Sequence, residues 1–258
     1  ENGYAVLTYD HAGHGKTAVS KTHHGYFHPD HAAKRVVDDA EKMAELLEQQ
    51  FPDVPHFVLG HSMGSFITRC LLQQAHHRFD GAVIVGTGGK QAIAPVAKVL
   101  FSILNLLVPK KRSETLNNFF NSLNNKRFKG DKDFSETSWL SVNQANRQAF
   151  VKDELCGIPF THNGFHTLLT LNVQSTKTNW ADAISKRLPF LFVSGAEDPI
   201  GDFGKGVTTT ATNLKKDGFQ DVSLNLYPGM RHEILNEDVK EQVFRDILDW
   251  LNGHCSEK

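Results

Sequence analysis

The sequence predicts an α/β fold in which a mostly parallel sheet is flanked by helices. Short apolar runs alternate with helical patterns over most of the 258 residues, and continuous apolar runs are typical of strands buried on both faces. Residues 90–186 interrupt this alternation, because no run there reads as a buried strand. A structureless loop of that length is improbable in one domain. We therefore expect an inserted helical cap (lid) at residues 90–186 and an α/β core at residues 1–89 and 187–258.

The elements of the core follow in order along the chain. Strands are expected at residues 4–9, 57–59, 82–85, 190–193 and 222–227. Helices are expected at residues 31–50, around 67–74, and near 203–216 and 239–251. The first helix has a face of regularly spaced apolar side chains, which predicts that this face is buried: Val36, Ala40, Met43 and Leu47.

Charge and cysteine content exclude several classes of function. Lys and Arg number 28 against 29 Asp and Glu, a formal net charge of -1. Nucleic-acid binding needs a clustered excess of cations, so we expect no nucleic-acid partner. Three scattered cysteines make neither a disulfide framework nor a metal pair. Because no apolar run is long enough to span a membrane and no signal-peptide pattern is present, we expect a cytoplasmic protein.

The pentapeptide Gly60-His61-Ser62-Met63-Gly64 lies between an expected strand and an expected helix. In a G-x-S-x-G elbow the serine occupies a strained strand-to-helix turn, and glycines flank it where a Cβ would collide with backbone. The turn exposes the serine hydroxyl above the sheet edge and directs a helix N-terminus toward the reacting centre. This context predicts that Ser62 is a nucleophile. A tight turn without a catalytic role is the alternative.

A serine nucleophile needs a base, and the base needs an orienting acid, in the chain order Ser, Asp, His in this architecture. Asp198 follows the strand expected at residues 190–193, and His232 follows the strand expected at residues 222–227. Both residues therefore lie at carboxyl ends of parallel strands, where α/β proteins place their ligand sites. Glu197 is a competing carboxylate at this point.

The remaining histidines do not have the spacing of a metal site. The adjacent pairs at residues 23–24 and 76–77 lack the i, i+4 spacing of helical metal ligands. Asp10, His11 and His14 could be read as ligands, but we expect their loop to line the floor of the site. No metal and no cofactor are predicted.

Four segments together resemble the bacterial lysophospholipase and monoacylglycerol-lipase-like branch of the α/β-hydrolases, of the serine aminopeptidase S33 type. They are residues 9–17 (YDHAGHGKT), 60–65 (GHSMGS), 194–204 (SGAEDPIGDFG) and 227–237 (YPGMRHEILNE). The resemblance extends over nearly the whole chain, including the expected cap. It implies the α/β-hydrolase fold and a catalytic triad, and it is less specific for the substrate.

By position, the resemblance assigns a role to each site residue. Ser62 would be the nucleophile, His232 the general base and then acid, and Asp198, rather than Glu197, the group that orients the imidazole. The backbone N–H of Met63 would be one donor of the oxyanion hole.

The resemblance also implies that the first strands of the family fold are absent from this chain. In the family the second oxyanion donor and three strands precede the position of residue 1. The third of these strands lies between the segments equivalent to residues 4–9 and 57–59. We therefore expect an N-terminally incomplete sequence, in which residues 4–9 do not pair directly with residues 57–59.

The activity implied by the resemblance is that of a serine carboxylester hydrolase, of the EC 3.1.1 type, that works through an acyl-enzyme. The expected substrates are monoacylglycerols or lysophospholipids, which are small-molecule esters with an apolar acyl chain. Apolar residues of the cap could form an acyl tunnel or a cap core: Ile103, Leu104, Leu106, Leu107, Phe119 and Phe120. The cap could also contact a membrane surface transiently, and the oligomeric state is left open.

Two other functions remain open at this point. A proline-iminopeptidase-like peptidase has the same fold and triad, and it predicts an acidic cluster in the cap that the sequence does not locate. A non-catalytic ligand-binding protein on a hydrolase scaffold is the alternative of a different class. The intact Ser-Asp-His set argues against a non-catalytic protein. The absence of the second oxyanion donor argues for a non-catalytic protein, unless the sequence is a fragment.

Overall fold

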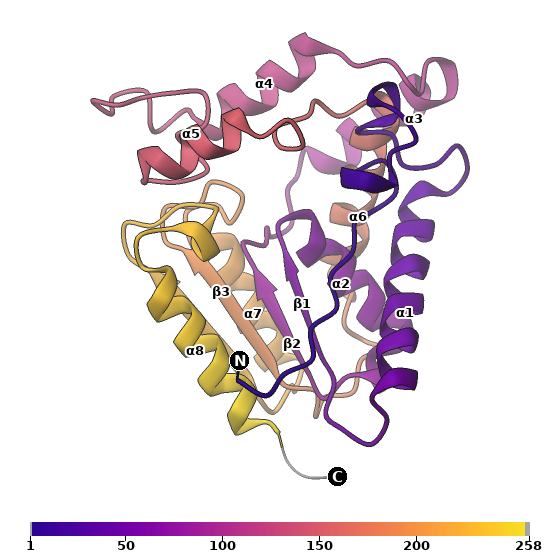
Figure 1. Ribbon diagram of the computed structural model, residues 1–258, viewed down its shortest axis with the longest axis vertical. Coiled ribbons are helices and arrows are strands. Elements are labelled where there is room, and N and C mark those ends of the chain that lie inside the picture. Colours follow the sequence, from indigo (N-terminus) through magenta and orange to yellow (C-terminus); the bar gives the residue numbers. More distant parts are fainter. Residues whose placement is uncertain (1, 256–258) are drawn as a thin grey trace.

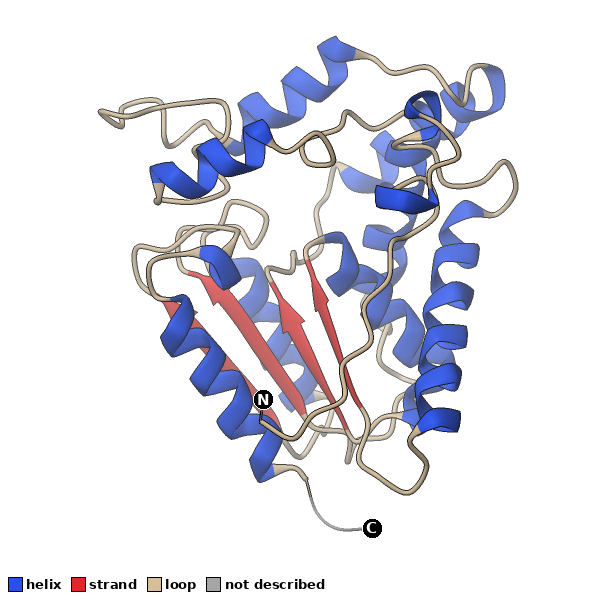
Figure 2. Ribbon diagram, viewed as in Figure 1, coloured by secondary structure: helices blue, strands red, loops and turns tan. Residues whose placement is uncertain are grey.

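A computed structural model of the protein describes residues 2–255. Its sheet has four parallel strands in the order β1-β2-β3-β4. They are β1 (Phe57–His61), β2 (Gly81–Val85), β3 (Phe190–Gly195) and β4 (Val222–Tyr227). These strands coincide with four of the five expected ones, and helices flank the sheet (Figure 2). The predicted fold class is confirmed.

Eight α-helices occur within residues 2–255. They are α1 (Ala32–Gln50), α2 (Met63–Ala75), α3 (Ala94–Leu107), α4 (Glu114–Asn124), α5 (Gln144–Lys152), α6 (His162–Thr176), α7 (Lys205–Lys216) and α8 (Lys240–Gly253). Short 3-10 helices lie at Gly15–Thr17, Lys21–His23, His76–Arg78 and Ile234–Asn236. The four helices predicted for the core are thus present as α1, α2, α7 and α8. In the part of the chain that the structure describes, no helix combines the length and apolar character that crossing a membrane requires.

The central strands β2 and β3 are buried along their whole length, whereas β1 and β4 are only partly buried. Alternate side chains of a strand point to opposite faces of the sheet. One face packs against α7 through Ile84, Phe190, Phe192, Val207 and Leu214. The other packs against α8 through Val83, Val85, Leu191, Val243 and Ile247. The expectation that every strand is buried on both faces is wrong for β1 and β4, which are the edge strands of the sheet among the described residues.

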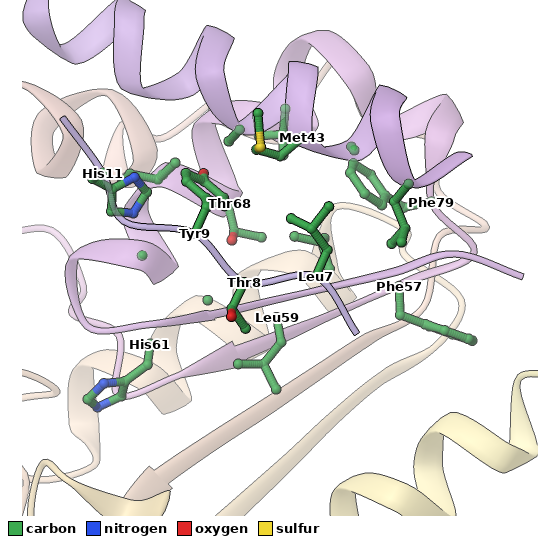
Figure 3. Close-up of a pocket in the computed structure, with 18 of the residues that line it drawn as sticks. Leu7, Thr8, Tyr9, His11, Met43, Phe57, Leu59, His61, Thr68 and Phe79 are labelled. Atoms are coloured by element: carbon green, nitrogen blue, oxygen red, sulfur yellow. The ribbon is translucent and has the colours of Figure 1, made fainter. Parts of the chain in front are cut away.

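Residues 4–9 do not form the strand that their apolar pattern predicts, which corrects the first element of the expected core. A strand needs backbone partners about 4.8 Å away, but a cavity of about 460 Å³ lies between Leu7, Thr8 and Tyr9 and the free edge of β1. Figure 3 shows these residues running past β1, with Met43 of α1 above them. Val6 is 79% exposed. Consistent with our expectation, the segment does not pair with β1.

Residues 90–186 contain α3 to α6 and, as far as the structure describes them, no strand. Figure 1 shows α4 and α5 above the carboxyl ends of the strands and α6 beside α1 and α2. Apolar side chains of α3, α4 and α6 meet around Phe101, Phe120 and Phe165, while Leu171 of α6 joins the cluster between α1 and α2. The helical character expected here is confirmed. The limits of the cap as a separate unit remain a prediction.

Candidate active site

Ser62 occupies the turn between β1 and α2. Its backbone has φ 54° and ψ -119°, a conformation that a non-glycine residue keeps only where its surroundings enforce it. The Ser62 N–H donates to the carbonyl of Val85 in β2 at 3.0 Å, which fastens the turn to the sheet. The serine therefore stands in a strained strand-to-helix turn, as the pentapeptide predicts.

The two glycines of the pentapeptide have different roles. A Cβ on Gly60 would lie 2.3 Å from the carbonyl oxygen of Gly64 and 2.4 Å from Thr68 Oγ1, because α2 begins directly above it. A Cβ on Gly64 would meet nothing within 4 Å outside its own helix. The expectation that both glycines avoid a collision is right for Gly60 and wrong for Gly64.

Three side chains from three loops meet above the carboxyl ends of the strands. His232 Nε2 lies 2.8 Å from Ser62 Oγ, and His232 Nδ1 lies 2.9 Å from Asp198 Oδ2. Ser62 follows β1, Asp198 follows β3 and His232 follows β4, and carboxyl ends of parallel strands share one edge of the sheet. The structure thus brings together all three side chains that the sequence singled out.

Asp198 and Glu197 are separated by burial. Asp198 is fully buried, with Oδ2 on His232 and Oδ1 accepting from the Ile200 N–H at 2.8 Å. Glu197 is exposed. Both oxygens of Asp198 therefore have defined donors, so the carboxylate is held in one orientation toward the imidazole.

The surroundings of His232 act on its pKa in opposite directions. Burial lowers the pKa, but the charge of Asp198, its hydrogen bond and the charge of Glu233 outweigh burial and leave the pKa raised above its ordinary value. With Nδ1–H donating to Asp198, the neutral ring has Nε2 free to accept from the Ser62 hydroxyl. The arrangement can thus withdraw a proton from Ser62 and hold it next to a buried negative charge.

Two aromatic side chains, His61 and Trp139, contact the His232 ring and were not identified as site residues from the sequence. His61 is partly buried, its ring centroid lies 4.9 Å from that of His232, and its Nε2–H donates to the His232 carbonyl at 3.1 Å. Burial and the neighbouring His232 lower the pKa of His61, which favours a neutral donor. Trp139 packs on His232 with centroids 5.1 Å apart. The adjacency of His61 to Ser62 was a usable signal, whereas nothing local pointed to Trp139.

The predicted oxyanion donor lies at the first residue of α2. Met63 begins the helix immediately after Ser62. The first N–H groups of an α-helix have no acceptor within the helix, and they carry the positive end of its dipole. The Met63 N–H is therefore suited to an oxygen that develops negative charge near Ser62.

The loop that holds Asp10, His11 and His14 does not gather metal ligands. Among residues 2–255, no group of three or more His, Cys, Asp or Glu side chains is arranged to hold a metal ion. His11 lines the cavity that also reaches Ser62. Burial lowers the pKa of His11 to about 4, so this ring is neutral at physiological pH.

Comparison with known proteins connects this geometry to a family. Residues 1–239 match the family model described as Hydrolase_4, serine aminopeptidase, S33. The chain is 22% identical over 261 residues to the monoacylglycerol lipase of Mycolicibacterium smegmatis, covering 98% of this chain and 79% of the relative. It is 24% identical over 253 residues to the monoglyceride lipase of Homo sapiens, covering 96% of this chain and 73% of the relative.

A solved structure shares the fold. The highly thermostable carboxyl esterase from Bacillus coagulans, in complex with glycerol, has a TM-score of 0.84 and 26% sequence identity. The match covers 95% of this chain and 79% of the esterase. Core and helical region are therefore both included in the similarity.

Proposed function

Because the chain belongs to the serine aminopeptidase S33 family of α/β-hydrolases, in its monoglyceride-lipase-like branch, we propose that Ser62, His232 and Asp198 form its catalytic triad. The family and its relatives make the protein a serine ester hydrolase. The observation that carries the proposal is the hydrogen-bonded line from Ser62 Oγ through the His232 ring to Asp198. These three groups perform the ester chemistry.

The reaction proceeds through an acyl-enzyme. His232 accepts the hydroxyl proton as Ser62 Oγ attacks the ester carbonyl carbon, and the resulting oxyanion accepts from the Met63 N–H. The carbon–oxygen bond to the alcohol then breaks, and His232 gives its proton to the leaving alkoxide. A water molecule, deprotonated by His232, attacks the acyl carbon; the bond from this carbon to Ser62 Oγ then breaks, His232 returns the proton to Oγ, and the acid is released. Asp198 stabilises the imidazolium in both halves of the reaction.

The proposed substrates are monoacylglycerol-type or lysophospholipid-type esters. Support comes from the relatives, which are named monoacylglycerol and monoglyceride lipases and match nearly the whole chain. Exposed apolar side chains provide further support: Val96, Val99, Leu100, Ile103, Leu106 and Leu107, which helical spacing places along one side of α3, and Phe119 and Leu123 on α4. Exposed apolar patches of this kind mark interaction sites. We propose that this surface makes transient contact with aggregated or membrane-bound ester.

The six apolar residues considered for an acyl tunnel fall into two groups, which differ in their exposure to solvent. Leu104 and Phe120 pack beside Phe101 and Phe165 in the interior of the helical region. The other four are exposed: Ile103, Leu106, Leu107 and Phe119. We therefore assign the exposed residues to the contact surface and not to the lining of an enclosed tunnel.

A proline-iminopeptidase-like activity is the second candidate, because the family description names an aminopeptidase. Such an enzyme uses the same nucleophile on an amide bond, so the triad geometry supports both reactions. The two differ in what the binding region accepts: a free substrate amine for the peptidase, and an apolar acyl chain for the esterase.

Labelling and a substrate panel test the proposal. We expect a fluorophosphonate probe to label the wild type and not Ser62→Ala, and Ser62→Ala to lose ester hydrolysis. On p-nitrophenyl esters of increasing chain length beside a prolyl anilide, we expect kcat/KM to rise with acyl length and the anilide to be a poor substrate. An unlabelled wild type would overturn the triad, and a preference for the anilide would favour the peptidase.

A further inference from the structure

The loop that carries His232 rests on a part of the helical region far from it in sequence. We call residues 228–237 the histidine loop, and residues 125–143, between α4 and α5, the bridging segment. Trp139 of the bridging segment packs on the His232 ring. Two sets of polar contacts also join the histidine loop to the bridging segment.

Glu237 provides the first set of contacts. Its side chain is 1% exposed. Oε1 accepts from the backbone N–H of Arg231 at 2.9 Å and of Val142 at 3.0 Å, and Oε2 accepts from Ser141 Oγ at 2.6 Å. One buried carboxylate therefore fixes the residue directly before His232 and also holds two residues of the bridging segment.

Arg231 provides the second set. Its guanidinium is buried, donates from Nη1 to the carbonyl of Ser138 at 2.7 Å, and donates from Nη2 to Asp131 at 2.5 Å. It also lies over the ring of Phe128, 3.9 Å from the centroid. All of these partners belong to the bridging segment.

Buried charges are tolerated only where hydrogen bonds or opposite charges replace the lost water. The carboxylate of Glu237 and the guanidinium of Arg231 meet this condition only while the two segments stay together. Displacing either segment would leave a buried charge without its partners. The contacts therefore allow one relative position of the histidine loop and the bridging segment.

We propose that Glu237 and Arg231 are positioning residues for catalysis, which hold His232 in line between Ser62 and Asp198 by fastening the histidine loop to the bridging segment. This inference rests on the proposed triad. It makes the bridging segment a support of the catalytic base as well as a cover over the site, and it assigns a function to two charged residues that do not touch the nucleophile.

A pH profile distinguishes positioning from a direct charge effect. The groups whose charges act on His232 are Asp198, Glu233 and the neighbouring His61. Ser141→Ala removes a donor to Glu237 without removing a charge. A change in the acid limb of kcat/KM, the low-pH side of the profile, in this variant therefore reports an altered position of His232 relative to Asp198.

The test compares Glu237→Gln and Ser141→Ala with the matched control Glu241→Gln, which alters an exposed glutamate of α8. Active enzyme is counted by fluorophosphonate titration, and kcat, KM and the acid limb are measured per active site. For Glu237→Gln we expect kcat to fall about 10- to 100-fold, the scale of a small misplacement of a catalytic group. We expect little change in KM and an acid limb displaced to lower pH, because His232 then lies farther from Asp198.

Ser141→Ala removes one donor to Glu237 and is expected to give a smaller change in the same direction, so it carries the test if Glu237→Gln does not fold. Arg231→Lys, which keeps the charge, is expected to retain more kcat than Arg231→Met. Variants with wild-type kcat per active site and an unmoved acid limb would overturn the inference, even if their thermal stability is lower. In that case a labelled, active wild type would leave the proposed triad intact, whereas an unlabelled wild type would contradict the triad itself.

Discussion

Glu197 and Asp198 are neighbours in the chain with opposite environments. Asp198 is buried on His232, whereas Glu197 is exposed to solvent. A buried carboxylate next to an imidazole stabilises the imidazolium strongly, because little water screens the charge. An exposed carboxylate is screened and has little effect. Of these two carboxylates, only Asp198 is therefore expected to act on the base.

Asp198→Asn tests this assignment at the residue scale. We expect kcat/KM to fall by about 10⁴, the effect of removing the acid from a serine triad. Asp198 raises the pKa of His232, and the base must be neutral to act, so the midpoint of the acid limb should move to lower pH. Rates measured between about pH 5 and 9 report both effects.

The control at this site is Glu197→Gln, which is expected to leave the rate and the profile unchanged. If Glu197→Gln lost activity as strongly as Asp198→Asn, the assignment of the orienting acid would be wrong.

The turn between β1 and α2 depends on one glycine more than on the other. A methyl group on Gly60 would collide with backbone of the first turn of α2, whereas one on Gly64 meets open space outside its helix. We expect Gly60→Ala to lower the free energy of unfolding by about 1–3 kcal/mol, the usual cost of overpacking.

Gly64→Ala is the matched variant, and it should be neutral or stabilise by up to about 1 kcal/mol, because alanine loses less backbone entropy in a helix. Urea unfolding of both variants measures the difference. Equal losses of stability would contradict this account of the turn.

Elements differ in how much they depend on distant partners. A helix satisfies its backbone groups internally, so the patterns of α1, α2, α7 and α8 sufficed to predict them. A strand needs a neighbour for its backbone groups. Residues 4–9 have a strand-like pattern but lie across a cavity from β1 and form no strand.

Several partly buried histidines make the stability of the whole molecule depend on pH. Burial lowers the pKa of His11 to about 4 and also lowers the pKa values of His14 and His61. Between an unfolded pKa of about 6.5 and these lower folded values, the unfolded chain binds protons that the folded chain does not. Stability should therefore fall as pH decreases through this range. His232, with its raised pKa, acts in the opposite direction but is a single group.

Urea unfolding at about pH 7 and pH 5 tests this dependence. We expect a lower free energy of unfolding at pH 5, and a smaller difference between the two values in His11→Gln, which does not titrate. The same difference in the wild type and in His11→Gln would show that His11 does not contribute.

The sequence by itself determined the order of the core elements, the serine turn and the three side chains proposed for catalysis. Hydrophobic period, turn chemistry and the position of a residue after a strand are local properties, so they can be read without a structure. Parallel strands then bring Ser62, Asp198 and His232 to one edge of the sheet.

Only the tertiary structure decided which strands are buried on both faces, that residues 4–9 form no strand, and that Gly64 has space for a side chain. It alone revealed the contacts of Glu237 and Arg231 with residues 125–143. The contacts of Glu237 and Arg231 join segments that are about a hundred residues apart in sequence. No local pattern specifies such a contact, because its free energy exists only once both partners are in place.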